Sequence, residues 1–256
     1  MTFKTKMEDA SRAKGSSIVL ALDFPFQTPE TRQTLLAKAQ TVLNAASPSV
    51  CAVKINHHLT LPLGIFDGVQ QLIRQAHDAG LPAIMDCKVN DIGATNQVIA
   101  EYYFAAGFDA VTANPFVGWE EGLKPLFDAA ARQQRGVILL TYMSHTGAEE
   151  GYGQTIRDAE TAAETKQYLA FARKALKWRA DGAVVGATVP EKIREIHAVL
   201  GETVPIYSPG VGAQGGAAAA AMQAGARFLI VGREITQAGN PAEAAEKLKA
   251  SAKRSG

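Results

Sequence analysis

The sequence predicts an α/β fold, a single (β/α)8 TIM barrel that covers residues 1–256. Short apolar or β-branched runs alternate with longer segments in which apolar residues recur at helical spacing. The runs do not alternate with polar residues, which is typical of buried parallel strands covered by helices. An open doubly wound sheet has the same alternation, so the count decides: eight units in about 250 residues favour a closed barrel. The eight expected strands are Ser17 to Leu22, Val50 to Ile55, Pro82 to Cys87, Ala110 to Ala113, Gly136 to Leu140, Gly182 to Val185, Pro205 to Tyr207 and Phe228 to Val231.

The segments between these runs have the features of helices. Residues 1–16 are polar and mixed in charge, and we expect an N-terminal extension or a capping helix there. The run Ala217 to Ala221 is a good helix former that follows a glycine-rich turn. No linker or low-complexity tract divides the chain, which favours one domain. Representative apolar helix faces are Val69, Leu72, Ile73 and Ala76 before a stop at Gly80, and Leu169, Ala172 and Leu176 later in the chain.

Composition and charge exclude several classes of function. The chain has 47% hydrophobic and 20% charged residues, enough apolar content for one barrel-sized core. Its net charge is +1 and no basic block stands out, so we expect neither a nucleic-acid nor a membrane partner. Residues 1–17 lack the apolar segment of a secretory signal, and no stretch reaches the ~18 apolar residues of a membrane span. Cys51 and Cys87 lie in expected buried strands, and a cytoplasmic location is expected.

The third expected strand carries a concentration of charge at its end. Asp86, Lys88 and Asp91 have the spacing D-x-K-x-x-D. Side chains two residues apart on a strand share a face, so Asp86 and Lys88 are expected to project together, with Asp91 on the following connection. Because an isolated buried charge is costly, such a group is paired, exposed or functional. The alternative is a solvated strand end with an incidental ion pair.

Other strand ends carry polar residues as well, and a barrel places its chemistry at the C-terminal ends of its strands. Charges at three consecutive strand ends would therefore meet at one mouth, which favours a functional Asp86, Lys88 and Asp91 group. The residues at these ends are Asp23 on the first strand, Lys54 on the second, Asp86 and Lys88 on the third, Ser144 after the fifth, Pro209 and Gly210 after the seventh, and Gly232 and Arg233 after the eighth.

A glycine-rich loop follows the seventh expected strand. Gly210, Gly212 and Gly215 form a G-x-G-x-x-G pattern, but a dinucleotide fingerprint belongs to the first strand-helix unit of its fold. Loops after strands seven and eight are the usual phosphate site of this barrel, where backbone N–H groups face the anion and Arg233 would add a bidentate charge. Two ordinary glycine turns are the alternative.

Together these residues resemble the orotidine 5′-monophosphate decarboxylase family. The resemblance runs from Leu20 to Arg233, and its short motifs follow the family's order. Gly93 and Thr146 depart from it, since relatives often have proline at these positions. The matching residues are Asp23, Lys54, the block Asp86, Lys88, Asp91 and Ile92 with Thr95, the turn Met143-Ser144-His145, the loop from Pro209 to Gln214, and Gly232-Arg233.

The resemblance implies an enzyme that converts orotidine 5′-monophosphate (OMP) to UMP and CO2 in pyrimidine biosynthesis, with no metal or organic cofactor. It implies a homodimer whose two active sites are shared, with Asp91 and Thr95 reaching into the partner's site. Lys88 is implied as the proton donor to C6, and Ser144 as a contact of the pyrimidine edge. The other implied substrate contacts are Asp23 and Lys54 at the ribose, Ile92 in the block that carries Asp91, and Pro209, Gly210, Gly212, Gln214, Gly232 and Arg233 at the phosphate.

The implied reaction leaves a carbanion at C6 with no cofactor to absorb its charge, so electrostatic stabilisation must do so. Lys88 as an ammonium would be the nearest cation, held by an alternating network with Asp86, Lys54 and Asp91. At an effective dielectric constant near 20, unit charges ~4 Å apart interact by about 4 kcal/mol, so four alternating charges can hold one another in place before substrate binds.

Two other functions are compatible with parts of the pattern. Sugar-phosphate relatives such as 3-keto-L-gulonate 6-phosphate decarboxylase share D-x-K-x-x-D but use Mg2+, and Lys54 at the second strand end would repel that ion. A catalytically silent UMP-binding barrel would keep the phosphate loop but lose the lysine, whereas Lys88 is present. His57 and His58 are expected to be a solvated pair on a strand and not metal ligands.

Overall fold

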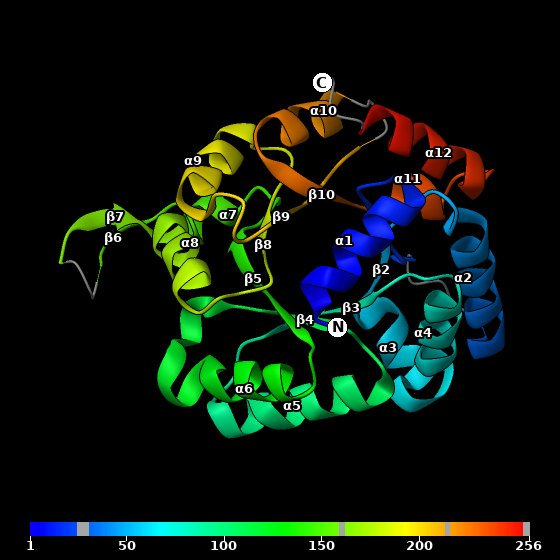
Figure 1. Cartoon of the computed structure of the whole chain (residues 1–256), viewed down its shortest axis with the longest axis horizontal. Helices are drawn as coiled ribbons and strands as arrows, with labels where there is room; N and C mark the ends of the chain where they lie inside the picture. The colour runs from blue at the N-terminus through cyan, green and yellow to red at the C-terminus, as the bar shows by residue number, and fades with distance from the viewer. Residues whose placement is uncertain (25–30, 159–161, 213–215, 253–256) are drawn as a thin grey trace.

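The computed structural model describes residues 1–24, 31–158, 162–212 and 216–252. Eight parallel strands close into a barrel in the order β1-β10-β9-β8-β5-β4-β3-β2, with helices around it (Figure 1), so the predicted (β/α)8 barrel is confirmed. Each strand overlaps one of the expected runs. The barrel strands are β1 (Ile18–Ala21), β2 (Ala52–Ile55), β3 (Ala83–Val89), β4 (Ala110–Ala113), β5 (Gly136–Tyr142), β8 (Gly182–Val185), β9 (Ile206–Pro209) and β10 (Ala226–Val231).

Three strands extend further at their C-terminal ends than the apolar runs predicted. Strand β3 continues to Val89, β5 to Tyr142 and β9 to Pro209. Of the added residues, Lys88 and Pro209 line a cavity at this end of the barrel, whereas Val89, Thr141, Tyr142 and Ser208 are buried. The prediction therefore underestimated the strands at the end where the chemistry is expected.

Helices surround the barrel, and most expected helix faces are buried. On α4, Val69, Leu72 and Ile73 are buried as predicted, but Leu176 on α8 is 38% exposed, so that assignment was wrong. The buried face of α8 is set instead by Tyr168, whose neighbours at helical spacing pack inward. The helices are α1 (Phe3–Lys14), α2 (Arg32–Ala46), α3 (His57–Leu63), α4 (Val69–Asp78), α5 (Gly93–Ala106), α6 (Lys124–Arg132), α7 (Ala148–Gly151), α8 (Gln167–Lys177), α9 (Pro190–Leu200), α10 (Gly216–Gln223), α11 (Arg233–Thr236) and α12 (Pro241–Ser251), with the irregular turns η1 (Gly64–Gly68), η2 (Pro115–Val117) and η3 (Trp119–Leu123).

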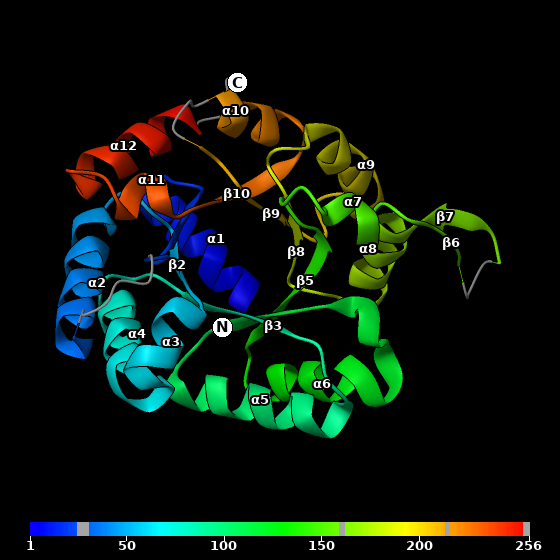
Figure 2. The same cartoon turned by 180° about the vertical axis from the view of Figure 1, so that it is seen from behind.

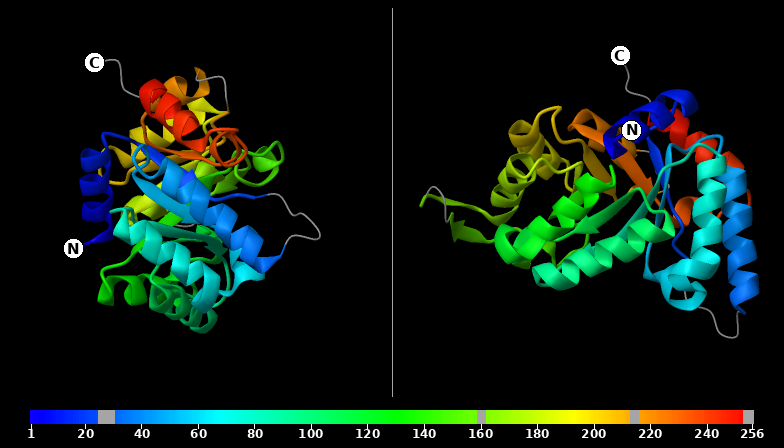
Figure 3. Two further views of the ribbon diagram at one scale, coloured as in Figure 1. Left: turned by 90° about the vertical axis from the view of Figure 1, so that its right-hand side faces the viewer. Right: turned by 60° about the horizontal axis from the view of Figure 1, so that its bottom comes forward.

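Helix α1 covers the N-terminal end of the barrel (Figure 3, left). Phe3 and Met7 are 0% and 1% exposed and belong to the core inside the barrel. Phe3 packs so closely on Gly136, the first residue of β5, that a Cβ there would lie 2.4 Å from the Phe3 ring. The helix thus supplies apolar side chains that fill the end of the barrel opposite the predicted site.

A buried carboxylate joins α1 to the starts of the strands. Asp109 is 2% exposed and contacts Lys6 at 2.6 Å, His77 at 2.8 Å and Arg135 at 2.8 Å. It also accepts a hydrogen bond from the backbone N–H of Ala83 at 2.9 Å. Burial alone would raise the pKa of Asp109, but hydrogen bonds from His77 and Lys6 outweigh it and lower the pKa from 3.8 to about 2.

We expect Asp109→Asn to lower the free energy of unfolding near neutral pH by about 2 kcal/mol or more, the equivalent of the pKa shift of Asp109. Because the folded pKa lies below the unfolded one, the charge stabilises the fold above about pH 4, and this contribution is lost as pH falls through about 2. Urea unfolding of both proteins between pH 7 and pH 2.5 should show the difference shrinking towards acid pH. Asp128→Asn, which removes an exposed helix carboxylate, is the control. An Asp109→Asn protein as stable as the wild type would contradict the prediction.

A small antiparallel hairpin, β6 (Thr155–Arg157) and β7 (Glu164–Lys166), projects from the barrel (Figures 1 and 2). Its strands are three residues each, and their residues are exposed or partly exposed. Such short polar strands have too little apolar alternation to be recognised from sequence, and none was predicted. In the ranges given above, no helix combines the length and apolarity that crossing a membrane requires.

Candidate active site

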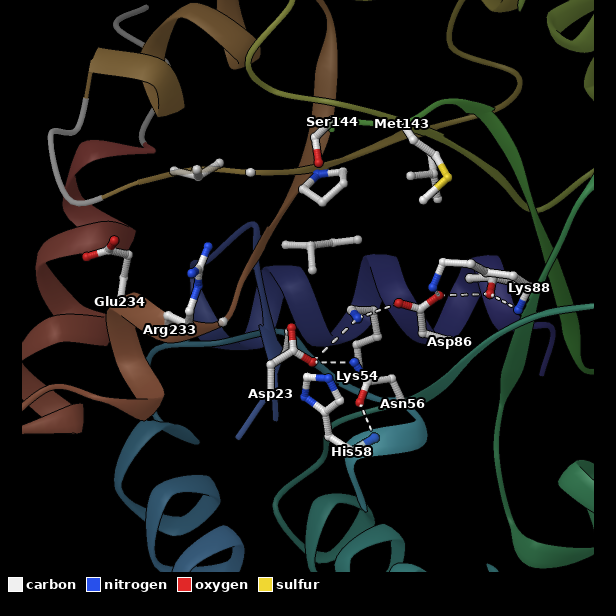
Figure 4. A pocket seen from close by; sticks show the side chains of 18 of the residues that line it. Asp23, Lys54, Asn56, His58, Asp86, Lys88, Met143, Ser144, Arg233 and Glu234 are labelled. Carbon is white, nitrogen blue, oxygen red and sulfur yellow. Dashed lines mark hydrogen bonds and ion pairs between the residues drawn. The ribbon is translucent and has the colours of Figure 1, made fainter. Parts of the chain in front are cut away.

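A cavity of about 610 Å3 lies at the C-terminal ends of the barrel strands (Figure 4). Most of the predicted site residues line it, although they come from both halves of the chain. Thr112, Leu140 and Val184 form an inner wall from β4, β5 and β8. The predicted residues on its wall are Asp23, Lys54, Asp86, Lys88, Ser144, Pro209, Gly210, Gly212, Gly232 and Arg233.

Four charged side chains alternate in sign along one side of this cavity. Lys54 Nζ lies 2.6 Å from Asp86 Oδ2 and 3.9 Å from Asp23 Oδ1. Lys88 Nζ lies 2.8 Å from the other carboxylate oxygen of Asp86. Asp86 and Lys88 thus project together, as their spacing predicted, and Asp86 holds one ammonium on each oxygen (Figure 4).

The charged state of Asp86 is fixed by these neighbours. Burial alone would raise the pKa of its carboxyl, but the ammonium groups of Lys54 and Lys88 outweigh burial and hold that pKa well below its usual range. Lys54 is 6% exposed, so its charge is balanced by the carboxylates and not by water. The site therefore carries a fixed pattern of charge at neutral pH, with the half-exposed Lys88 ammonium at the cavity end of the row.

Asn56 orients Asp23, a role that the sequence did not indicate. Its amide Nδ2 donates to Asp23 Oδ1 at 2.7 Å, and its Oδ1 accepts from the backbone N–H of His58 at 2.9 Å. Asn56 is the N-cap of α3, so His57 and His58 lie on a helix and not on a strand. Both side chains are exposed, as expected for a solvated pair, but the expected strand was wrong; His58 lines the cavity and His57 lines a neighbouring one. An asparagine directly before an apolar segment was the signal that could have indicated a helix start.

Thr112 on β4 was missed for another reason. It is 3% exposed and bonds through Oγ1 to both Asp86 and the backbone of Lys88. Inside an apolar run a threonine counts as an ordinary β-branched strand residue, and nothing in its sequence context indicates a polar partner.

The opposite side of the cavity carries Met143 and Ser144, which follow β5. Ser144 is confined between two glycines. A Cβ on Gly186 would lie 2.7 Å from Ser144 Cα, and one on Gly210 would lie 3.2 Å from Ser144 Cβ. The ends of β5, β8 and β9 can approach each other here only because the residues that follow β8 and β9, Gly186 and Gly210, have no side chain.

The predicted phosphate end is formed by the loop after β9 and by Gly232 and Arg233 after β10 (Figure 4). Gly210 has a φ of +92°, which favours glycine. Glu234 and Gln237 also line the cavity at this end and were not predicted. The predicted contact Gln214 lies outside the described residues.

Asp91, Ile92 and Thr95 do not line this cavity. Asp91 and Thr95 are exposed beyond β3 and at the start of α5, and Ile92 is 68% exposed. Asp91 instead lines a second cavity of about 290 Å3, which shares Lys88 with the first. Lys88 thus stands between a cavity built by its own barrel and one that opens at the surface around Asp91.

Within the described part of the chain, no three His, Cys, Asp or Glu side chains gather closely enough to hold a metal ion. Of the carboxylates that line the cavity, Asp23 and Asp86 have the Lys54 ammonium between them. A divalent ion would have to displace this group or share its space, which costs like-charge repulsion.

Comparison with known proteins gives matches over most of the chain. Residues 16–248 match the model of the Orotidine 5'-phosphate decarboxylase / HUMPS family. The chain is 37% identical over 232 residues to an orotidine 5'-phosphate decarboxylase of Methanosarcina mazei, covering 91% of this chain and 93% of that one. The crystal structure of the Pyrococcus horikoshii enzyme of that name superposes with a TM-score of 0.74 at 31% identity, covering 92% and 98% of the two chains. That of the Methanocaldococcus jannaschii enzyme complexed with the inhibitor BMP gives a TM-score of 0.75 at 29% identity, covering 93% and 99%.

Proposed function

The chain belongs to the orotidine 5′-phosphate decarboxylase / HUMPS family and is a carboxy-lyase, and from this premise we propose that it converts OMP to UMP and CO2 with Lys88 as proton donor. The observation that carries the proposal is the row of alternating charges Asp23, Lys54, Asp86 and Lys88 on one wall of the cavity. These charges hold one another in position through contacts within the protein, which suits a reaction that depends on electrostatic stabilisation.

In the proposed reaction, the bond between C6 and the carboxylate carbon breaks and its electron pair stays on C6. The Lys88 ammonium stabilises this pair and then gives a proton to C6, which yields UMP and a neutral amine that solvent reprotonates. Asp86 holds the Lys88 ammonium in place at 2.8 Å, and Lys54 keeps Asp86 ionised. No step requires a cofactor.

The rest of the cavity supplies binding energy and orientation. We assign Asp23 and Lys54 to the ribose hydroxyls, Ser144 to the pyrimidine edge, and the Gly210 to Gly212 loop with Arg233 to the phosphate. The arrangement of the cavity supports this assignment, because the row of charged side chains faces Ser144 across the cavity (Figure 4). The phosphate contacts lie far from C6, so their binding energy would act on positioning and loop closure.

Lys54 also separates this proposal from the Mg2+-dependent members of the family. The direct test follows the loss of OMP absorbance after chelator treatment, with 3-keto-L-gulonate 6-phosphate plus Mg2+ as the control substrate. We expect turnover of OMP that the chelator does not change, and none of the sugar phosphate. Turnover of the sugar phosphate alone would contradict the proposal.

We also propose a homodimer in which Asp91 and Thr95 of each chain complete the partner's site. Tyr102 on α5 lines the same cavity as Asp91 and meets the ring of Phe66 edge-on at 6.1 Å. These two rings are 57% and 54% exposed and form a small apolar patch beside Asp91. Such a patch is typical of a surface that another chain covers.

A cytoplasmic location suits the two cysteines, which are unpaired.

Arg233→Ala is expected to raise KM for OMP at least tenfold and to lower kcat/KM in parallel or further, because phosphate binding helps to close the site. Steady-state kinetics with OMP measure both constants. Arg179→Ala, which removes an arginine that does not line the cavity, should leave them unchanged. If Arg233→Ala had wild-type kinetics, the glycine-rich turn would be a structural feature and not a phosphate site.

A further inference from the structure

The pairing of β3 with β4 is irregular at the residues that carry the charge. Met85 pairs with Val111 and Val89 pairs with Ala113, so Asp86, Cys87 and Lys88 lie opposite a single residue, Thr112. A bulge of this kind bends the strand and redirects side chains, and bulges are common next to active sites. Here the bulged residues include both Asp86 and Lys88.

Lys88 has an unusual backbone at this bulge. Its φ is +52°, in the left-handed region that non-glycine residues rarely adopt and that costs about 1 kcal/mol or more. Such a conformation persists only where the surrounding structure holds it. Contacts with neighbouring residues must therefore hold Lys88 in this conformation.

The Thr112 hydroxyl is one of these contacts. It accepts a hydrogen bond from the Lys88 backbone N–H at 2.9 Å and donates one to Asp86 Oδ1 at 3.1 Å. The same oxygen of Asp86 receives the Lys88 ammonium at 2.8 Å. The buried hydroxyl thus bridges the Lys88 backbone N–H and the Asp86 oxygen that binds the Lys88 ammonium, using one donor and one acceptor position.

Resting on the proposed function, we infer that Thr112 is a positioning residue for the decarboxylation. It fixes the Lys88 ammonium by tying the Lys88 backbone at the bulge and by orienting the carboxylate that holds Nζ. The role depends on the hydroxyl and not on the packing of the methyl group.

Thr112→Val removes this hydroxyl with little change in volume. The Lys88 N–H and one lone pair of Asp86 then lose their partner in a buried setting, and Lys88 is free to relax from its left-handed conformation. Because a misplacement of about 1 Å can cost about 100-fold in rate, we expect kcat to fall ~10- to 100-fold. The phosphate and pyrimidine contacts are untouched, so KM and the inhibition constant of UMP should stay within about threefold, the signature of an interaction that acts mainly in the transition state.

The experiment compares Thr112→Val with Thr112→Ser and with Thr141→Val. Serine keeps the hydroxyl and should retain kcat within about threefold of wild type. Thr141 is an equally buried threonine on β5, does not line the cavity, and makes only a 3.5 Å contact with the Leu139 carbonyl. Its valine variant controls for loss of a buried hydroxyl and should leave kcat unchanged. Thr112→Ala replaces the valine variant if that protein does not fold.

The result that would overturn the inference is a folded Thr112→Val or Thr112→Ala enzyme with kcat within threefold of wild type. A serine variant as slow as the valine variant would also overturn it, because the hydroxyl would then not be the cause. The wild-type assay tests the proposed function separately. An inactive wild type contradicts that function, whereas an active wild type with equally active Thr112 variants contradicts only the role of Thr112.

Discussion

Lys88→Ala is expected to remove nearly all decarboxylation of OMP while leaving the barrel folded. The substitution deletes the proposed proton donor and the cation nearest to the developing carbanion, and it leaves Asp86 with Lys54 as its one remaining ammonium partner. We expect kcat/KM to fall by ~1,000-fold or more, since proton donation contributes about 100- to 10,000-fold and electrostatic stabilisation adds to it. The loss of OMP absorbance at high enzyme concentration measures the residual rate.

Lys124→Ala is the matched control, because Lys124 is an exposed helix lysine paired with Asp128 outside the cavity. Its activity and circular dichroism spectrum should equal those of the wild type. Lys88→Ala should keep the same spectrum, because Lys88 is half-exposed and adds little to the core. Residual activity within tenfold of wild type would mean that another group supplies the proton and that the assignment of Lys88 is wrong.

Mixing two inactive variants is expected to restore activity if the sites are shared between subunits. Lys88→Ala dimers keep Asp91, and Asp91→Ala dimers keep Lys88. After subunit exchange, one of the two sites in each heterodimer would combine both wild-type residues. Random exchange of equal amounts would make about half the dimers mixed, so about a quarter of all sites should be active.

The control for this experiment mixes Lys88→Ala with Lys54→Ala. Both residues line the same cavity of one barrel, so no heterodimer has a complete site and activity should stay absent. Exchange itself is measured by mass spectrometry of differently tagged chains. If exchange is complete and the Lys88→Ala and Asp91→Ala mixture stays inactive, Asp91 acts within its own chain or not at all.

The barrel and most of its cavity were predictable because their signals are local in sequence. Buried parallel strands are apolar runs, and the barrel topology brings their polar ends to one mouth, as it does for Asp23, Lys54 and Asp86. Thr112 and Asn56 could not be recognised in this way. Their importance depends on hydrogen bonds to residues on neighbouring strands, and such pairs are set by register, which sequence pattern leaves open.

The bulge in β3 is the clearest example. Sequence spacing correctly placed Asp86 and Lys88 on one side of the strand, but it assumed a strand without a bulge. The left-handed backbone of Lys88 could not be predicted, because a lysine gives no indication of a positive φ. The prediction that Leu176 is buried was wrong because it rested on the apolar side chain alone. Tyr168 and Phe171 determine which face of α8 packs inward, and Leu176 lies off that face. Local propensity is overridden where several larger side chains compete for one core.

Helix α1 limits the routes by which reaction products can leave the barrel. Phe3 and Met7 fill the barrel interior at the end where the strands begin, so in the described part of the chain the barrel axis is blocked on that side. CO2 formed at C6 would therefore have to depart through the same mouth that admitted the nucleotide. If UMP still occupies that mouth, CO2 has to pass it or wait, so the order in which the two products leave would be decided at the mouth. Carbon isotope effects and viscosity dependence of turnover would report on that order.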